Sequence, residues 1–283
     1  MSSNEVRVKV IESKIKKGIT TNIISMTKDF TKFNNIIGLP KHPQTFKEQY
    51  LTSIQMKLFN EGIHPTKQNK LHLNKARQNG WTELILRALA FHSFHKYAGG
   101  KIIIIAGTRE KTTKDIFYRF MSLFNNIQEY VAEKGALYMK LINGTEIYGM
   151  PANPEAVTGW TKIKAIFMDE AAKWNLVDDY PVINAIMPIV RTNKADLFMI
   201  STPKGPRGFF YDFDIADNDF HKFVIDIWEG GRELYSRDEI QKMIDSTEED
   251  PDQEYLNKYT TGRDSIWGEV TDEHRSDEEE MML

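Results

Sequence analysis

Two short segments contain the residue types best suited to chemistry, and the first has the features of a phosphate-binding loop. In a loop of the form GxxxxGK[ST], backbone N–H groups and a helix N-terminus surround the phosphates, a lysine reaches their oxygens and a hydroxyl holds Mg²⁺. The segment from Lys75 to Thr82 (KARQNGWT) has Gly80 and Thr82 at the second glycine and hydroxyl positions. Trp81 replaces the usual lysine, but Lys75 stands at the first position, from which a lysine can also approach the phosphates. Taken alone, the segment also fits a surface turn between a strand and a helix.

The second segment is an apolar run that ends in two acids, Asp169 and Glu170. An acid at the end of a strand can hold Mg²⁺ through water, and a following glutamate can polarise the water that attacks a γ-phosphate. The alternative is a buried strand whose first exposed residues happen to be acidic. The acids follow the loop with a further apolar strand between them, and this order favours the catalytic interpretation.

Two further elements fit the same chemistry. Ser201-Thr202-Pro203 directly follows an apolar strand, and hydroxyl residues at that point could sense a γ-phosphate and pass its loss to a neighbouring segment. As a strand-ending turn with proline, the triplet would need no function. Gln55 stands before a helical pattern, where its amide could contact an adenine edge.

Short apolar segments alternate with helical patterns from Leu71 onward, which is typical of an α/β sheet with crossover helices. Apolar runs predict buried parallel strands, and a three- and four-residue spacing predicts amphipathic helices. We expect strands at 71–73, 102–105, 163–168 and 197–200, helices at 84–94 and 116–131, and a hairpin that turns at Asn143-Gly144 between 137–142 and 145–150. Ligands bind at the carboxyl ends of the strands in open α/β sheets.

Composition excludes several classes of protein. The 283 residues, 41% hydrophobic and 27% charged, fit one or two globular domains. No apolar run is long enough to span a bilayer and the N-terminus has no secretory signal, so we expect a soluble intracellular protein. The absence of cysteine excludes disulfide scaffolds, thiolate metal sites and cysteine nucleophiles. A net charge of −3 means that contact with nucleic acid requires a local basic patch or assembly.

Taken in order, Gln55, the Lys75–Thr82 loop, Asp169-Glu170 and Ser201-Thr202-Pro203 resemble the ATPase domain of the large terminase subunit, the DNA-packaging motor of tailed phages and related viruses. The resemblance runs from about Lys47 to Tyr259. Its most specific part is the loop, because terminases are similar in carrying Arg or Arg-Gln within it, as Arg77-Gln78 do here, and some members also place the lysine first and an aromatic residue before the hydroxyl.

The resemblance implies a RecA-like ASCE P-loop NTPase fold, with a central mostly parallel sheet flanked by helices, and ATP hydrolysis coupled to translocation of double-stranded DNA into a prohead. It implies that Glu170 and Arg77 are catalytic, with Arg77 as a possible arginine finger, and that Thr82 and Asp169 hold Mg²⁺. It further implies a coupling role for Ser201, Thr202 and Pro203. The ATP-binding residues would be Lys75, Gln78, Asn79, Gly80, Trp81, Thr82 and Gln55.

By the same resemblance, the expected partners are double-stranded DNA, further copies in a homo-oligomeric ring on a portal, a small terminase subunit and a separately encoded nuclease, with no membrane. The expected location is the host cytoplasm, for a bacteriophage or archaeal virus, and transiently the prohead portal. We expect a helical or partly disordered lead-in at 1–40, the ATPase core at 41–235, a helical linker region at 236–263 and an acidic disordered tail at 264–283.

The sequence departs from the family's pattern in two places. Many members have an arginine before the glycine that precedes the acidic strand, and here Thr158 precedes Gly159. Terminases also continue into a nuclease domain, which we expect to be absent here, either encoded separately or truncated away. A finger supplied by a neighbouring subunit could be Arg77, Arg109, Arg191 or Arg207. Two alternatives stay open: another ASCE translocase or helicase, and a non-catalytic ATP-binding module, which Trp81 in the lysine position favours.

Overall fold

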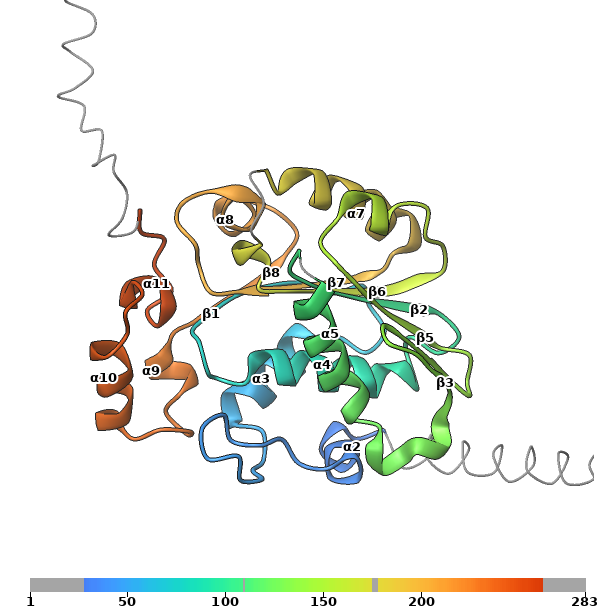
Figure 1. Cartoon of the computed structure of the whole chain (residues 1–283), viewed down its shortest axis with the longest axis horizontal. Coiled ribbons are helices and arrows are strands. Elements are labelled where there is room, and N and C mark those ends of the chain that lie inside the picture. The colour runs from blue at the N-terminus through green and yellow to red at the C-terminus, as the bar shows by residue number, and fades with distance from the viewer. Residues whose placement is uncertain (1–27, 109, 175–177, 262–283) are drawn as a thin grey trace, which may run out of the picture.

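One twisted eight-stranded sheet forms the centre of the molecule (Figure 1). The computed structural model describes residues 28–108, 110–174 and 178–261. The strand order is β3-β4-β5-β2-β6-β7-β1-β8, and every neighbouring pair from β5 to β8 is parallel, whereas β3, β4 and β5 are antiparallel. The strands are β1 (Lys70–Lys75), β2 (Lys101–Ala106), β3 (Val131–Lys134), β4 (Tyr138–Leu141), β5 (Glu146–Met150), β6 (Ile163–Asp169), β7 (Asp196–Ser201) and β8 (His221–Ile225).

Helices cover both faces of this sheet, so the fold has three layers (Figure 1). The helices on the lower face in Figure 1 are α2 (Phe30–Ile37), α3 (Ser53–Gly62), α4 (Trp81–Ser93) and α5 (Glu110–Ser122), with the 3-10 helix η1 (Asn125–Tyr130). Those on the upper face are α6 (Pro154–Val157), α7 (Tyr180–Asn193) and α8 (Gly208–Ile215), with the 3-10 helix η2 (Ala171–Lys173). The chain then forms α9 (Ile227–Gly230), α10 (Arg237–Asp245) and α11 (Pro251–Glu254). These helices lie on the side of the sheet where Figure 1 labels β1.

The isoleucine run of β2 explains why the sheet needs both helical layers. Side chains alternate between the two faces of a strand. Ile102 and Ile104 pack in the core under α4 and α5, while Ile103 and Ile105 pack in the core under α7, and none of the four is exposed. Such a strand is stable only when both faces are covered, as in other parallel sheets.

The predicted strands and the hairpin at Asn143-Gly144 are confirmed, but the predicted helix over 116–131 is wrong in its second half. The α-helix ends at Ser122, and η1 follows with a non-helical residue at Ile127 (φ −137°). Ile127 and Tyr130 are nevertheless buried. The apolar spacing therefore correctly predicted which side chains face the core, although it did not predict that the α-helix ends before them.

Residues 30–37 lie within the segment predicted as a lead-in and form a helix of the core. Asp29 caps α2 by accepting hydrogen bonds from the N–H groups of Thr31 and Lys32. Phe30 stacks on Phe59 of α3, with ring centroids 3.7 Å apart. The rest of the lead-in (1–27) and the acidic tail (264–283) lie outside the described residues.

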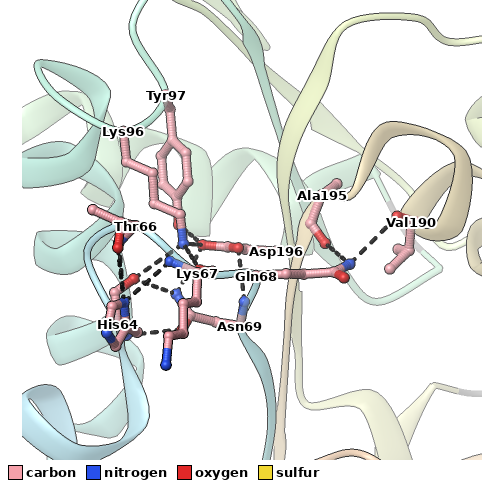
Figure 2. Close-up of polar contacts among 10 residues, drawn as sticks. All are labelled: His64, Thr66, Lys67, Gln68, Asn69, Lys96, Tyr97, Val190, Ala195 and Asp196. Atoms are coloured by element: carbon pink, nitrogen blue, oxygen red, sulfur yellow. Dashed lines mark hydrogen bonds and ion pairs between the residues drawn. The ribbon is translucent and has the colours of Figure 1, made fainter.

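A buried polar network joins three elements at the amino-terminal edge of the parallel strands (Figure 2). The carboxylate of Asp196, 1% exposed at the start of β7, accepts hydrogen bonds from the backbone N–H of Asn69 at 2.8 Å and from its Nδ2 atom at 2.9 Å. It also accepts from Lys96 Nζ at 2.6 Å and from the Tyr97 hydroxyl at 2.5 Å. Gln68 bonds to the Ala195 carbonyl at 2.8 Å. This network fixes the starts of β1 and β7 to the chain that leaves α4.

None of the helices in the described part of the chain is both long enough and apolar enough to cross a membrane.

Candidate active site

The phosphate-loop segment passes from β1 into α4 through a tight turn. Gln78 (φ 60°) and Gly80 (φ 72°) both have left-handed backbone. A Cβ atom at Gly80 would lie 2.9 Å from Nε2 of Gln55, so this position requires glycine both for its conformation and for the close approach. The first N–H groups of a helix have no partner within the helix. The N-terminus of α4 therefore presents free donors beside the loop, where an anion can bind.

Parallel pairing brings the loop, the two acids and the hydroxyl residues to one edge of the sheet. Asn74 of β1 pairs with Ser201 of β7, and Asp169 of β6 pairs with Ile200 of β7. The strand order β6-β7-β1 thus places β7 between the loop and the acids. This edge is the carboxyl end of the strands, where open α/β sheets bind their ligands.

Lys75 and Glu170 form an ion pair across the end of β7. The Nζ atom of Lys75 contacts Oε1 of Glu170, and the lysine side chain is 7% exposed while the glutamate side chain is 38% exposed. A buried ammonium group needs a charged partner. Glu170 fills that role.

Thr82 and Asp169 form the second pair of the site. The Thr82 hydroxyl donates to Oδ1 of Asp169 at 2.9 Å. Burial, followed by the neighbouring charge of Glu170, raises the pKa of Asp169 to about 6 against opposing effects of Lys75 and Thr82. An added cation would stabilise the charged form of this carboxylate.

Glu170 has a strained backbone and hydroxyl neighbours. It lies in the left-handed region (φ 49°, ψ 43°), which is uncommon for a residue other than glycine. Its Oε2 atom accepts from the Thr202 hydroxyl at 3.3 Å and lies 3.4 Å from the Ser201 hydroxyl, which donates over a shorter distance, 2.7 Å, to the Thr202 carbonyl. Burial raises the pKa of Glu170, but the charge and hydrogen bond of Lys75 outweigh burial, so the pKa is lowered. The side chain is therefore an ionised acceptor at neutral pH.

The donor set fits a magnesium ion held together with phosphate oxygens. Mg²⁺ prefers oxygen ligands and is usually bound by one or two carboxylates plus substrate phosphates and water. Asp169 and Thr82 supply two such oxygens, 2.9 Å apart, at the start of α4. Over the described residues, no group of three or more acidic or histidine side chains forms a metal cage.

Gln55 holds the loop from the side of α3. Its Oε1 atom accepts from the N–H of Thr52 at 2.9 Å, which completes a capping box. Its Nε2 atom donates to the Asn79 carbonyl at 2.9 Å. Both ends of the amide are thus engaged with backbone, and contact with adenine would require an exchange of partners. The adenine role of Gln55 stays a prediction.

Arg77 points toward the C-terminal helices. Its Nε atom lies 2.6 Å from Oε2 of Glu254, and its NH1 atom lies 3.1 Å from Oε2 of Glu249. Lys173 forms a further ion pair with the same Glu254. The Gln78 carbonyl accepts from the Tyr235 hydroxyl at 2.9 Å. Residues far along the chain therefore hold the middle of the loop.

The remaining candidates lie apart from this cluster. Trp81 is 1% exposed and its indole belongs to the hydrophobic core. At the position where a phosphate-binding loop usually has lysine, this chain therefore has a side chain that packs in the core. Pro203 is buried after β7. Arg191 at the end of α7 and Arg207 before α8 are exposed, and Arg109 lies outside the described residues.

A pocket of about 890 Å³ lies over the loop. Its wall continues from the loop to the 37–48 segment and to the end of α5. Sequence reasoning missed most of this wall, including Phe46 and Arg119. Phe46 is 72% exposed and has φ 56°, and Arg119 of α5 borders the pocket from the opposite side. The spacing of α5 gave a signal only for its apolar side, and no motif includes Phe46.

Comparison with known proteins identifies the fold. No family model matches the sequence, and neither does any curated protein. Two structures of the ATPase domain of a Thermus phage large terminase, one of them a mutant, superpose with TM-scores of 0.59 and 0.57 at 20% identity and cover 81% of this chain and 98% of that domain.

The large terminase of a thermophilic bacteriophage, in complex with ADP, superposes with a TM-score of 0.56 at 13% identity and covers 74% of this chain. This chain spans 54% of that terminase. The expected likeness to terminase ATPase domains is confirmed at the level of the fold, and the RecA-like ASCE fold class with it.

Proposed function

We propose that this protein hydrolyses ATP as a motor subunit that translocates double-stranded viral DNA into a prohead. The observation that carries the proposal is the convergence of Lys75, Asp169, Glu170 and Thr82 on one edge of the sheet. A cation, two acids with separate environments and a hydroxyl at a helix N-terminus are the groups that phosphoryl transfer needs. The likeness of the fold to terminase ATPase domains supports the packaging role.

Each side chain has a role that follows from its position. Lys75 binds the phosphates in exchange for its contact with Glu170. Thr82 and Asp169 would hold Mg²⁺, which when bound neutralises charge on the phosphate oxygens. Glu170, released from the lysine, accepts a hydrogen bond from the attacking water and polarises it. Arg77 is the proposed finger, and to act within its own chain it must leave Glu254.

Ser201 and Thr202 are proposed to couple hydrolysis to motion. Both hydroxyls lie near the same oxygen of Glu170, and the Thr202 hydroxyl donates to it, so a change at the carboxylate alters that hydrogen bond directly. Ser201 ends β7, and the chain continues through Pro203 toward α8. Movement at the acid can thus pass to the segment that follows β7.

We further propose that DNA binding depends on assembly. The net charge of −3 does not attract a duplex to a single copy. A homo-oligomeric ring on a portal and a small terminase subunit are the proposed partners, and the host cytoplasm is the proposed location.

The test is steady-state ATP hydrolysis with and without linear double-stranded DNA, with Glu170→Gln as the blank. Hydrolysis that vanishes in the blank and rises with duplex DNA supports the motor. Stimulation by single strands alone favours a helicase. Nucleotide binding without hydrolysis, in the presence of DNA and of assembled portal, contradicts the proposal and favours a non-catalytic module.

A further inference from the structure

Three arginines line the pocket, and they differ in how firmly they are held. Arg77 forms ion pairs with Glu254 at 2.6 Å and with Glu249 at 3.1 Å. Arg87 is 4% exposed and bonded to Glu83 at 2.7 Å, with further bonds to α2 and the residue after it. Arg119 has one ion pair at 3.5 Å, also with Glu83, and is 49% exposed. Arg119 is therefore the most weakly held of these cations.

The position of Arg119 directs it toward the start of α4. Phe117 and Phe120, its neighbours on α5, are fully buried against the sheet, and Arg119 lies outside that apolar face. Its NH2 atom approaches Oε2 of Glu83, which is in the first turn of α4 and next to Thr82.

Release of Arg119 from Glu83 leaves no unpaired charge behind. Glu83 keeps its shorter bond to Arg87, one helical turn along α4. An ion pair between partly exposed groups contributes little stability. A phosphate group, with more negative charge and several acceptor oxygens, is the stronger partner for a guanidinium.

We propose that Arg119 leaves Glu83 and binds the terminal phosphate of ATP from the α5 side of the pocket. The inference rests on the proposed function, because it names a further phosphate-binding residue of the same site. We assign Arg119 to the terminal phosphate because its partner Glu83 is next to Thr82, which bonds to Asp169. Arg119 then distinguishes ATP from ADP, since ADP lacks its partner.

The test compares dissociation constants for ADP and for a non-hydrolysable ATP analogue in the full chain with Mg²⁺. In Arg119→Gln we expect the analogue to bind about ten- to a hundredfold more weakly, while ADP binding stays within about twofold. Arg119→Lys should fall between, because an ammonium keeps the charge and loses the bidentate geometry. Lys114→Gln is the matched control, because Lys114 lies on the same helix in a surface ion pair with Glu110.

Three outcomes overturn the inference. An unchanged ratio of the two dissociation constants in Arg119→Gln means that Arg119 does not contact the terminal phosphate. An equal loss of both affinities means that Arg119 only supports the fold of the pocket. An equal shift in Lys114→Gln means that the effect reflects net charge. If the unaltered protein binds neither nucleotide, the proposed function itself fails.

Discussion

Lys75 and Glu170 neutralise each other although their strands are not neighbours in the sheet. β7 separates them, and the two side chains meet above its end. There Ser201 and Thr202 contact the second carboxylate oxygen of the glutamate, Oε2. The lysine, the acid and the hydroxyl residues therefore form one connected unit. Replacing the lysine partner by phosphate changes the environment of every member.

Lys75→Ala should remove most ATP hydrolysis and leave the fold intact. In the proposed role the side chain contacts phosphate, and it belongs to none of the three hydrophobic clusters, so we expect kcat to fall at least about a hundredfold. Steady-state hydrolysis and far-ultraviolet circular dichroism measure the two effects. Lys57→Ala, on the exposed side of α3, is the control. Unchanged turnover in Lys75→Ala would remove this lysine from the mechanism.

Asp169 should make stability depend on pH. Its pKa of about 6 lies above the ordinary value of 3.8, so the folded protein retains a proton that the unfolded chain loses between these values. Stability from this group is fully present below pH 3.8 and is lost as the pH rises through 6. Asp169→Asn should flatten this dependence and raise the unfolding free energy near neutral pH by on the order of 1–3 kcal/mol.

Urea unfolding across that range checks the stability of Asp169→Asn. The same variant should lose hydrolysis, because an amide neutralises no cation. A variant that is less stable near neutral pH than the unaltered protein, or one that retains full hydrolysis, contradicts the role given to Asp169.

Phe46→Ala should weaken the binding of ATP and ADP equally. An exposed aromatic ring with strained backbone at a pocket wall is suited to stack on a base, which is common to both nucleotides. Stacking contributes about 1–3 kcal/mol, so we expect dissociation constants to rise about five- to a hundredfold. Tyr50→Ala is the control, because Tyr50 is 68% exposed and does not line the pocket. Loss of ATP binding alone would exclude a base contact.

His92→Leu should stabilise the protein. His92 is 2% exposed among aromatic rings, and neither ring nitrogen has a hydrogen-bond partner. Removing these nitrogens should add about 1 kcal/mol to the unfolding free energy. Burial lowers the pKa of His92 to about 3 from 6.5, so the unaltered protein loses stability as the pH falls from 6.5 toward 3. Thermal unfolding at two pH values tests this, and a destabilised leucine variant would contradict it.

The parallel part of the sheet was predictable from sequence because fully buried strands must be apolar on both faces. The runs at 102–105, 163–168 and 197–200 have this property and became β2, β6 and β7. Edge strands were harder to recognise. β8 (His221–Ile225) is only partly buried, so its residues give no clear strand pattern. It forms a strand by pairing with β1.

The candidate site was predictable where strand ends determine position. Lys75, Asp169 and Ser201 each end a strand, and parallel pairing then brings them together. The capping box at Thr52 and Gln55 also has a sequence signature, TxxQ, which explains the contact of Gln55 with backbone. Sequence spacing gives no information about packing between distant segments. Such packing places Phe46 and Arg119 at the pocket and forms the ion pair between Arg77 and Glu254.

The buried carboxylate of Asp196 gives the sheet a mechanical asymmetry. It anchors the starts of β1 and β7 at the edge opposite the pocket through direct hydrogen bonds (Figure 2), whereas the pocket end of β1 is held by Glu170 and Asn257 from other segments. A load on the pocket edge would travel along the strands to a fixed point and would not shear them past each other.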